Sequence, residues 1–189
     1  MIDYKSLGHI NIVVDDIEKA IKYYTELFFC RPKQFFPHFK NVGFSKSAGF
    51  IDRVVDVSIC FLEIPNTGIF LELMEYHDPI GYKSSVEKKT NNIGGVGHIC
   101  IKVGNIDYAF NHIKNTKDTK LISLSEKYKP FFISPITKDD FNLFDEQHES
   151  SIEEKENVCS IIKKIRYFYF LDKYNIQWEF EQGHDDIGE

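Results

Sequence analysis

The strongest constraint on this chain is that it repeats itself. The segment GHINIVV at residues 8–14 matches GHICIKV at residues 97–103, an offset of 89 residues (98 minus 9). Further on, IFLEL at residues 69–73 matches IQWEF at residues 176–180, an offset of 107 residues (179 minus 72). The offsets differ by 18 residues (107 minus 89), so the second copy carries an insertion, for which the acidic stretch 139–156 is the candidate. A duplication of this kind predicts two copies of one supersecondary unit.

Both copies predict the same order of elements. His9 to Val14 is apolar and β-branched, which favours a strand, and Asp15 and Asp16 can cap an amphipathic helix from Ile17 to about Phe28. Further strands are predicted at residues 55–64 and 68–76, at 165–171 and 176–181, and more weakly at 33–38 and 120–123. The sequence therefore predicts an α+β fold with two paired βαβββ modules, residues 1–90 and 91–189. We expect them to form a curved mixed sheet with a central metal-binding cup.

Alternation along the strands places four potential metal ligands on one side of the sheet. Successive strand residues point to opposite faces, so His9 faces the cup if Ile10 packs under the helix. The same argument places Glu72, His98 and Glu179 on the cup side, between apolar neighbours. Two imidazoles and two carboxylates converging near the axis that relates the modules would suit one divalent ion, Zn, Ni, Co or Mn. Burying these four groups without a cation would be costly.

Charge and hydropathy argue against two classes of partner. The formal net charge of −6 leaves no broad basic surface for nucleic acid. No stretch approaches the ~18 apolar residues needed to span a membrane, and residues 1–10 lack the pattern of a secretion signal. We therefore expect a cytoplasmic protein. Its four cysteines form no CxxC pair and are expected to be free thiols: Cys30, Cys60, Cys100 and Cys159.

Four stretches of the chain resemble one superfamily. LGHINIVVDDIEKAIKYYTELF, FLEIPNTGIFLELMEYHDP, GGVGHICIKVGNIDYAF and YFLDKYNIQWEFEQ are similar to the vicinal oxygen chelate (VOC) superfamily. That group includes glyoxalase I, methylmalonyl-CoA epimerase, fosfomycin-resistance enzymes, extradiol dioxygenases and bleomycin-binding proteins. The resemblance omits mainly the loop 40–53 and the acidic stretch 139–156. It implies metal ligation by His9, Glu72, His98 and Glu179.

This ligand set predicts proton transfer next to a carbonyl. A divalent ion can accept two substrate oxygens, polarise a carbonyl and stabilise the negative charge that develops on deprotonation. A glutamate can then move the proton. From the resemblance to glyoxalase-like members, we expect Glu179 to act as the base and Glu72 as its counterpart. The predicted function is that of a divalent-metal-dependent lyase or isomerase of the glyoxalase type, acting on a small molecule.

Two other functions fit the same superfamily. A non-catalytic protein that binds an antibiotic or metabolite would generally lack the metal ligands, and an Fe(II) dioxygenase would use a single glutamate. Seven aromatic residues in connecting segments could line an apolar pocket, although ordinary packing explains them as well: Phe35, Phe36, Phe39, Phe131, Phe132, Phe141 and Phe144. We interpret the remaining histidines as surface residues (His38, His112, His148 and His184) and as a turn residue (His77). A homodimer is the expected assembly.

Overall fold

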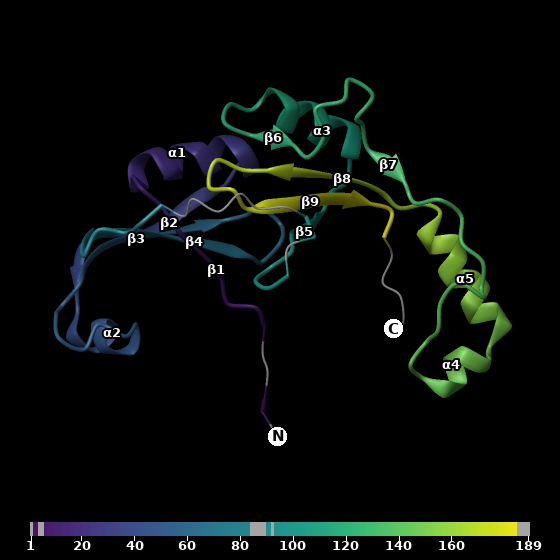
Figure 1. The fold of residues 1–189 in the computed structure, drawn as a ribbon, viewed down its shortest axis with the longest axis horizontal. Helices are drawn as coiled ribbons and strands as arrows, with labels where there is room; N and C mark the ends of the chain where they lie inside the picture. The colour runs from purple at the N-terminus through teal and green to yellow at the C-terminus, as the bar shows by residue number, and fades with distance from the viewer. Residues whose placement is uncertain (1, 4–5, 84–89, 92, 185–189) are drawn as a thin grey trace. The chain divides into compact units, whose positions relative to one another are not determined.

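The computed structural model describes residues 2–3, 6–83, 90–91 and 93–184. The chain forms two compact units: unit 1, Met1–Val86, and unit 2, Glu87–Glu189. Unit 1 contains a mixed sheet of four strands, and unit 2 contains a mixed sheet of five (Figure 1). The predicted α+β class with mixed sheets is confirmed. Every described helix is too short or too polar to span a lipid bilayer.

Unit 1 follows the predicted order of strand, helix and three strands, with one added helix. Its strands run in the order β1-β4-β3-β2, with β1 parallel to β4 and the other neighbours antiparallel. Helix α1 packs across one face of this sheet, against β2, β3 and β4 (Figure 1). The elements are β1 (Ile10–Val13), α1 (Ile17–Phe28), β2 (Arg31–Lys40), α2 (Val42–Ser47), β3 (Asp56–Glu63) and β4 (Phe70–Asp78).

Helix α1 begins where the sequence predicts. The Asp16 carboxylate accepts a hydrogen bond from the Lys19 backbone N–H at 2.9 Å, which caps the first turn. A side chain from the last strand adds a second contact, because Glu75 Oε2 accepts from the Ile17 N–H at 2.8 Å. Helical periodicity predicts an apolar stripe of Ile17, Ala20, Ile21, Tyr24, Leu27 and Phe28. The structure buries five of these six residues, and Tyr23 is buried in place of Ile21. Helix α1 is thus attached to the sheet both by its buried apolar side chains and by the hydrogen bond between Ile17 and Glu75.

The segment after α1 departs from the prediction. The weak strand expected at residues 33–38 is the ten-residue edge strand β2, and its pairing with β3 shifts register twice. Helix α2, which was not predicted, is capped by the Asn41 side chain accepting from the Phe44 N–H at 2.9 Å. Phe44 packs against a small buried cluster formed by β3, the residue before it and β4: Val55, Val57, Ile59 and Met74. Strand alternation places Met74 on the face opposite α1, so this face of the sheet is partly covered.

Unit 2 repeats the same plan with a longer connection. The strand order is β5-β9-β8-β6, with β7 paired to β8 and β5 parallel to β9. Helix α3 packs against β6, β8 and β9. The elements are β5 (Ile99–Lys102), α3 (Ile106–Asn115), β6 (Lys120–Leu121), β7 (Phe131–Phe132), α4 (Glu146–Ser150), α5 (Ile152–Ile162), β8 (Arg166–Leu171) and β9 (Gln177–Gln182).

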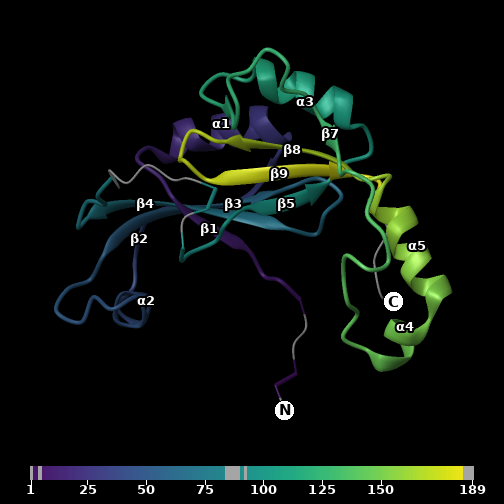
Figure 2. The same cartoon turned by 45° about the vertical axis from the view of Figure 1, so that its right-hand side comes forward.

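The acidic stretch 139–156 is part loop and part helix, with residues 139–145 irregular. It contains α4 and the first part of α5, which continues to Ile162. The two helices pack on each other and lie beyond the end of the sheet of unit 2 (Figure 2). Side chains cap both starts, since Asp145 accepts from the N–H groups of Gln147 and His148, and Ser151 accepts from that of Glu154. From its acidic composition the sequence predicts a surface loop or a short solvated helix here, and the stretch contains both.

Cysteine chemistry also follows the prediction. All four cysteines are free thiols, and Cys30 and Cys60 are buried. Burial raises the pKa of the Cys30 thiol to about 12 and that of Cys60 to about 11. Since the thiolate is the reactive form, both side chains act as small apolar core residues at neutral pH.

Candidate metal centre

The first His–Glu pair lies on the face of the unit 1 sheet that points away from α1. His9 directly precedes β1, Glu72 lies on β4, and His9 Nε2 is 3.2 Å from Glu72 Oε2. Asn11 pairs with Glu72 in the parallel register, and its amide donates to Glu72 Oε2 at 2.9 Å. The Glu72 side chain is 15% exposed and that of His9 is 45% exposed, so the imidazole is open to a ligand.

Unit 2 contains the equivalent pair. His98 directly precedes β5, and His98 Nε2 is 2.9 Å from Glu179 Oε2 on β9. Cys100 occupies the position of Asn11, opposite Glu179 in the parallel register. The exposed fractions also correspond, at 40% for the His98 side chain and 12% for that of Glu179. The duplicated sequence motifs thus give duplicated geometry.

An aromatic ring packs edge-on against each histidine. The ring centroids of His9 and Phe61 are 5.8 Å apart, and those of His98 and Tyr169 are 5.2 Å apart. Phe61 is the strand partner of Glu72, and Tyr169 is the strand partner of Glu179. Each imidazole is therefore held by a neighbour from the adjacent strand, and the two neighbours differ by a hydroxyl group.

The donor atoms of each pair have the spacing of two ligands on one ion. Ligands about 2.1 Å from an ion and at right angles to each other lie roughly 3.0 Å apart. The N–O distances of 3.2 Å in unit 1 and 2.9 Å in unit 2 are close to that value. One imidazole nitrogen and one carboxylate oxygen from each unit suit a borderline divalent ion. That all four donors share a single ion stays a prediction.

Glu179 has the more unusual electrostatic setting of the two glutamates. Burial raises its pKa, and the charge of Glu181 adds to this effect, while the charge of His98 and a hydrogen bond from Tyr169 oppose it. Burial and the neighbouring Glu179 also raise the pKa of Tyr169, to about 12. Cys100 shares this acidic surrounding, and burial together with Glu179 and Glu181 raises its pKa to about 12. Negative charge is therefore concentrated around the second glutamate.

A cavity of about 530 Å³ opens beside His9 in unit 1. Its size lies within the range of small-molecule sites. On its wall, Lys33 Nζ forms an ion pair with Glu63 Oε2 at 2.7 Å. None of the seven aromatic residues predicted as possible pocket lining contributes to it, and its lining is Gly8, His9, Lys33, Gln34, Phe61, Glu63 and Phe70. The aromatic surface of this cavity thus comes from β3 and β4.

The structure also corrects one assignment made from the sequence. His77 was predicted as a turn residue, but it belongs to β4, which continues to Asp78. There it lies close to His38 of β2 and to Asp56 of β3, and each of the three offers a potential ligand atom. Sequence spacing gave no signal for this group, because it depends on how three strands pair.

Comparison with known proteins assigns the chain to a superfamily. The sequence profile of the Glyoxalase/Bleomycin resistance protein/Dioxygenase superfamily matches residues 8–123. Human mitochondrial methylmalonyl-CoA epimerase is 30% identical over 125 residues, which make up 65% of this chain and 58% of that protein. The mouse enzyme is 28% identical over 125 residues, with the same coverage. The chain thus spans 58% of the length of these curated relatives.

Solved structures share the fold at low sequence identity. A glyoxalase family protein from Bacillus cereus superposes with a TM-score of 0.63 at 14% identity, covering 96% of this chain and 97% of that chain. A fosfomycin resistance protein from Listeria monocytogenes superposes with a TM-score of 0.51 at 16% identity, covering 94% of this chain and 93% of that chain. At such identities the likeness concerns the fold alone.

Proposed function

Because the chain belongs to the glyoxalase/bleomycin resistance protein/dioxygenase superfamily, we propose that it is a metal-dependent isomerase or lyase. In this proposal His9, Glu72, His98 and Glu179 together hold one divalent ion. The observation that carries it is the duplicated His–Glu pair, with donor atoms 3.2 Å apart in unit 1 and 2.9 Å apart in unit 2. A surface ion pair that served only the fold would not need to recur at equivalent strand positions.

The reaction we propose is proton transfer at a carbon next to a carbonyl group. A divalent ion bound at these residues would stabilise the negative charge that develops on the carbonyl oxygen. Glu179 would remove the proton, the role that the resemblance to glyoxalase-like members gives it. Glu72, whose carboxylate accepts from the Asn11 amide at 2.9 Å, would return or receive the proton on the other side.

The cavity beside His9 supports a small substrate with an apolar segment. Phe61 and Phe70 supply apolar wall, and the ion pair between Lys33 and Glu63 cancels the charge of the lysine. The curated relatives are named for epimerisation of methylmalonyl-CoA, an acyl thioester. We therefore propose an acyl thioester, a 2-oxo acid or a hemithioacetal as the substrate class, with its apolar part against these two rings.

Metal content is the first test of this function. Protein stripped with EDTA and reloaded with Zn, Ni, Co or Mn would be desalted and measured by elemental analysis. We expect the His9→Ala/Glu179→Ala double variant to retain one ion fewer per chain than the wild type. Equal metal content in the two proteins would contradict the proposed ligand set.

Hydrogen exchange with solvent is the second test. In D₂O, the loaded wild type should exchange the hydrogen on the carbon next to the carbonyl of at least one compound from the three classes, as followed by NMR. The double variant should leave the same compound unchanged. Uptake of no ion at these residues would favour a metal-free binding protein of the same fold.

Assembly as a homodimer stays a prediction, which analytical ultracentrifugation of the purified protein would check.

A further inference from the structure

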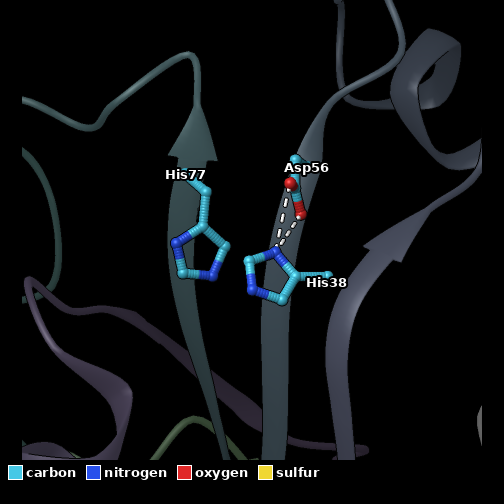
Figure 3. A group of neighbouring side chains, drawn as sticks. All are labelled: His38, Asp56 and His77. Carbon is cyan, nitrogen blue, oxygen red and sulfur yellow. Dashed lines mark hydrogen bonds and ion pairs between the residues drawn. The ribbon is translucent and has the colours of Figure 1, made fainter.

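A second group of potential metal ligands lies elsewhere in unit 1. His38 of β2, Asp56 of β3 and His77 of β4 project toward one another (Figure 3). His38 Nδ1 is 3.0 Å and 3.1 Å from the two carboxylate oxygens of Asp56. The rings of His38 and His77 stack with their centroids 4.5 Å apart. One ligand atom from each residue lies within 4.8 Å of the other two.

The backbone of β2 turns His38 toward this group. The register between β2 and β3 shifts between Phe36 and Phe39, and His38 adopts a positive φ of 50°. A bulge of this kind re-aims a side chain, and positive φ is uncommon for residues other than glycine. Such conformations cost free energy and tend to occur at functional sites. The position of the His38 imidazole is thus a specific product of local structure.

Each ring nitrogen of the second histidine has a polar side chain next to it. His77 Nε2 is 2.8 Å from Ser58 Oγ on the neighbouring strand. On the other side of the ring, His77 Nδ1 is 3.6 Å from Glu75 Oε1. Histidines that bind metals usually have such a partner on the nitrogen that faces away from the ion, and it fixes their orientation. Either nitrogen of His77 can therefore face an ion while the other keeps a polar neighbour.

This group is separate from the His9–Glu72 pair. His77 follows Glu72 by five residues on β4 (77 minus 72), which corresponds to roughly 16 Å along a strand. The odd separation also places the two side chains on opposite faces of the sheet. An ion at one position cannot be ligated by residues of the other.

We propose that His38, Asp56 and His77 form a second divalent-cation site, independent of the first. Two imidazole nitrogens and one carboxylate oxygen suit a borderline ion such as Zn, Ni, Co or Cu. Ligands on a tetrahedral ion lie roughly 3.4 Å apart, so separations of up to 4.8 Å need to close by as much as about 1.4 Å (4.8 minus 3.4). The His38 side chain is 64% exposed and can make this movement. Water would fill the remaining positions.

A neighbouring lysine supplies a sharp test of this site. Lys40 Nζ lies 3.2 Å from Asp56 Oδ2, so its charge competes with a cation for the same carboxylate. Removal of the lysine in Lys40→Met should therefore tighten binding of the ion at this site. If His38, Asp56 and Lys40 only form a structural network of charges, the same change should weaken that network and should not tighten binding of the ion. The direction of the effect separates the two accounts.

Titration of the 189-residue chain with Zn²⁺ and Co²⁺ after EDTA treatment tests the proposal. Calorimetry should show two ions per chain for the wild type and one for the His38→Asn/His77→Asn double variant. The single variant His38→Asn should weaken the second site by at least about tenfold. Asparagine tolerates positive φ, so this change removes the ligand while the backbone of the bulge is kept. His112→Asn, on α3, serves as the matched histidine control and should bind like the wild type.

These variants distinguish the absence of the first proposed site from the absence of the second. His9→Ala/Glu179→Ala should still bind one ion at the second site, whatever its effect on hydrogen exchange. His38→Asn/His77→Asn should keep the first ion and the exchange activity. If this variant binds as many ions as the wild type with the same affinities, the second site does not exist. Weaker binding by Lys40→Met would also overturn the proposal.

Discussion

In unit 1 the amide of Asn11 donates to Glu72, whereas in unit 2 the equivalent position is the thiol of Cys100. Phe61 flanks His9, but Tyr169 flanks His98 and also forms a hydrogen bond with Glu179. The His–Glu pairs are the same, and the residues around them are not. The duplicated scaffold thus fixes where the proposed ligands lie, while the neighbouring strand positions determine the surroundings of each glutamate.

The helix starts show a second difference of the same kind. In unit 1 the Glu75 carboxylate accepts from the Ile17 N–H at 2.8 Å. In unit 2 the Gln182 amide oxygen accepts from the Ile106 N–H at 2.9 Å. The two contacts occupy equivalent positions, but one acceptor is charged and the other is neutral. The hydrogen bond is common to both units, but only in unit 1 does the acceptor of this bond carry a charge.

The largest expected effect distinguishes the two glutamates by their chemistry. Glu179→Gln should slow hydrogen exchange in the metal-saturated protein by about 10²–10⁴-fold, because the amide cannot accept the proton. Glu72→Gln should slow it less, since we assign the removal of the proton to Glu179. NMR in D₂O with a compound that the wild type exchanges gives both rates. A larger loss in Glu72→Gln would reverse the assignment, and equal losses would mean that the units share the role.

The next effect concerns the cores of the two units. Leu71 and Trp178 occupy equivalent strand positions, and both are fully buried. Trp178→Ala should lower the free energy of unfolding by about 3–5 kcal/mol, and Leu71→Ala by about 2–5 kcal/mol. Urea denaturation followed by circular dichroism in EDTA measures both. A loss below about 1 kcal/mol in either variant would show that its unit contributes little to the cooperative core.

A conservative change isolates a polar contact that only unit 2 has. Trp178 Nε1 donates to Asp172 Oδ2 at 2.9 Å in a buried position. Trp178→Phe keeps an aromatic ring and removes this donor, so it should cost about 1–3 kcal/mol of stability. Leu71→Met, a volume-conserving change at the equivalent position, should cost less than about 1.5 kcal/mol. If both cost the same, the indole contact adds no stability.

A smaller effect is expected from the helix starts. Glu75→Gln keeps an acceptor for the Ile17 N–H but removes the negative charge near the N-terminus of α1. We expect a loss of about 0.3–1 kcal/mol at low ionic strength, which salt should reduce. Gln182→Glu is the reciprocal change at α3 and should raise stability. Thermal unfolding at two salt concentrations checks both signs, and a salt-independent loss would point to a packing effect instead.

The smallest effect depends on pH. Both Arg166 NH groups donate to Asp107 at 2.7 Å, and this contact lowers the pKa of the Asp107 carboxyl below its ordinary value of 3.8. The stabilisation is therefore fully present above pH 3.8 and disappears as the pH falls through the lower pKa of the folded state. Asp107→Asn should be less stable than the wild type at neutral pH, and this difference should vanish in acid. Glu18→Gln, at the equivalent position in unit 1, is the matched control variant.

Much of the fold could be predicted because the duplicated segments have clear periodicity. The strand and helix at each repeat start, and the hairpin that carries each glutamate, lie within one or two residues of the predicted bounds. Strand alternation predicted the face of the sheet on which the two histidines and two glutamates lie, since the face of a strand residue depends only on its position. Their pairing also depends on the parallel register of β1 with β4 and of β5 with β9. A shift of one residue in these strands would have buried both carboxylates under the helices.

The remaining features depend on information that the local sequence does not contain. Pro32 and Pro37 argue against a long strand, yet β2 accommodates both because it is an edge strand with two register shifts. Helix α2 is only six residues long and includes a glycine, so its propensity is weak. The group of His38, Asp56 and His77 depends on the pairing of three strands and on a bulge. No spacing along the chain predicts such a combination.

The position of the long connection in unit 2 has an evolutionary consequence. Residues 122–165, with β7, α4 and α5, join β6 to β8, whereas His98 and Glu179 belong to the segments at β5 and β9. Insertions and deletions in this connection can therefore accumulate without disturbing the residues proposed to bind the ion. Selection can act on the connection and on the ligand pair independently. Homologous chains are then expected to differ most in length between β6 and β8, and least around His9 and His98.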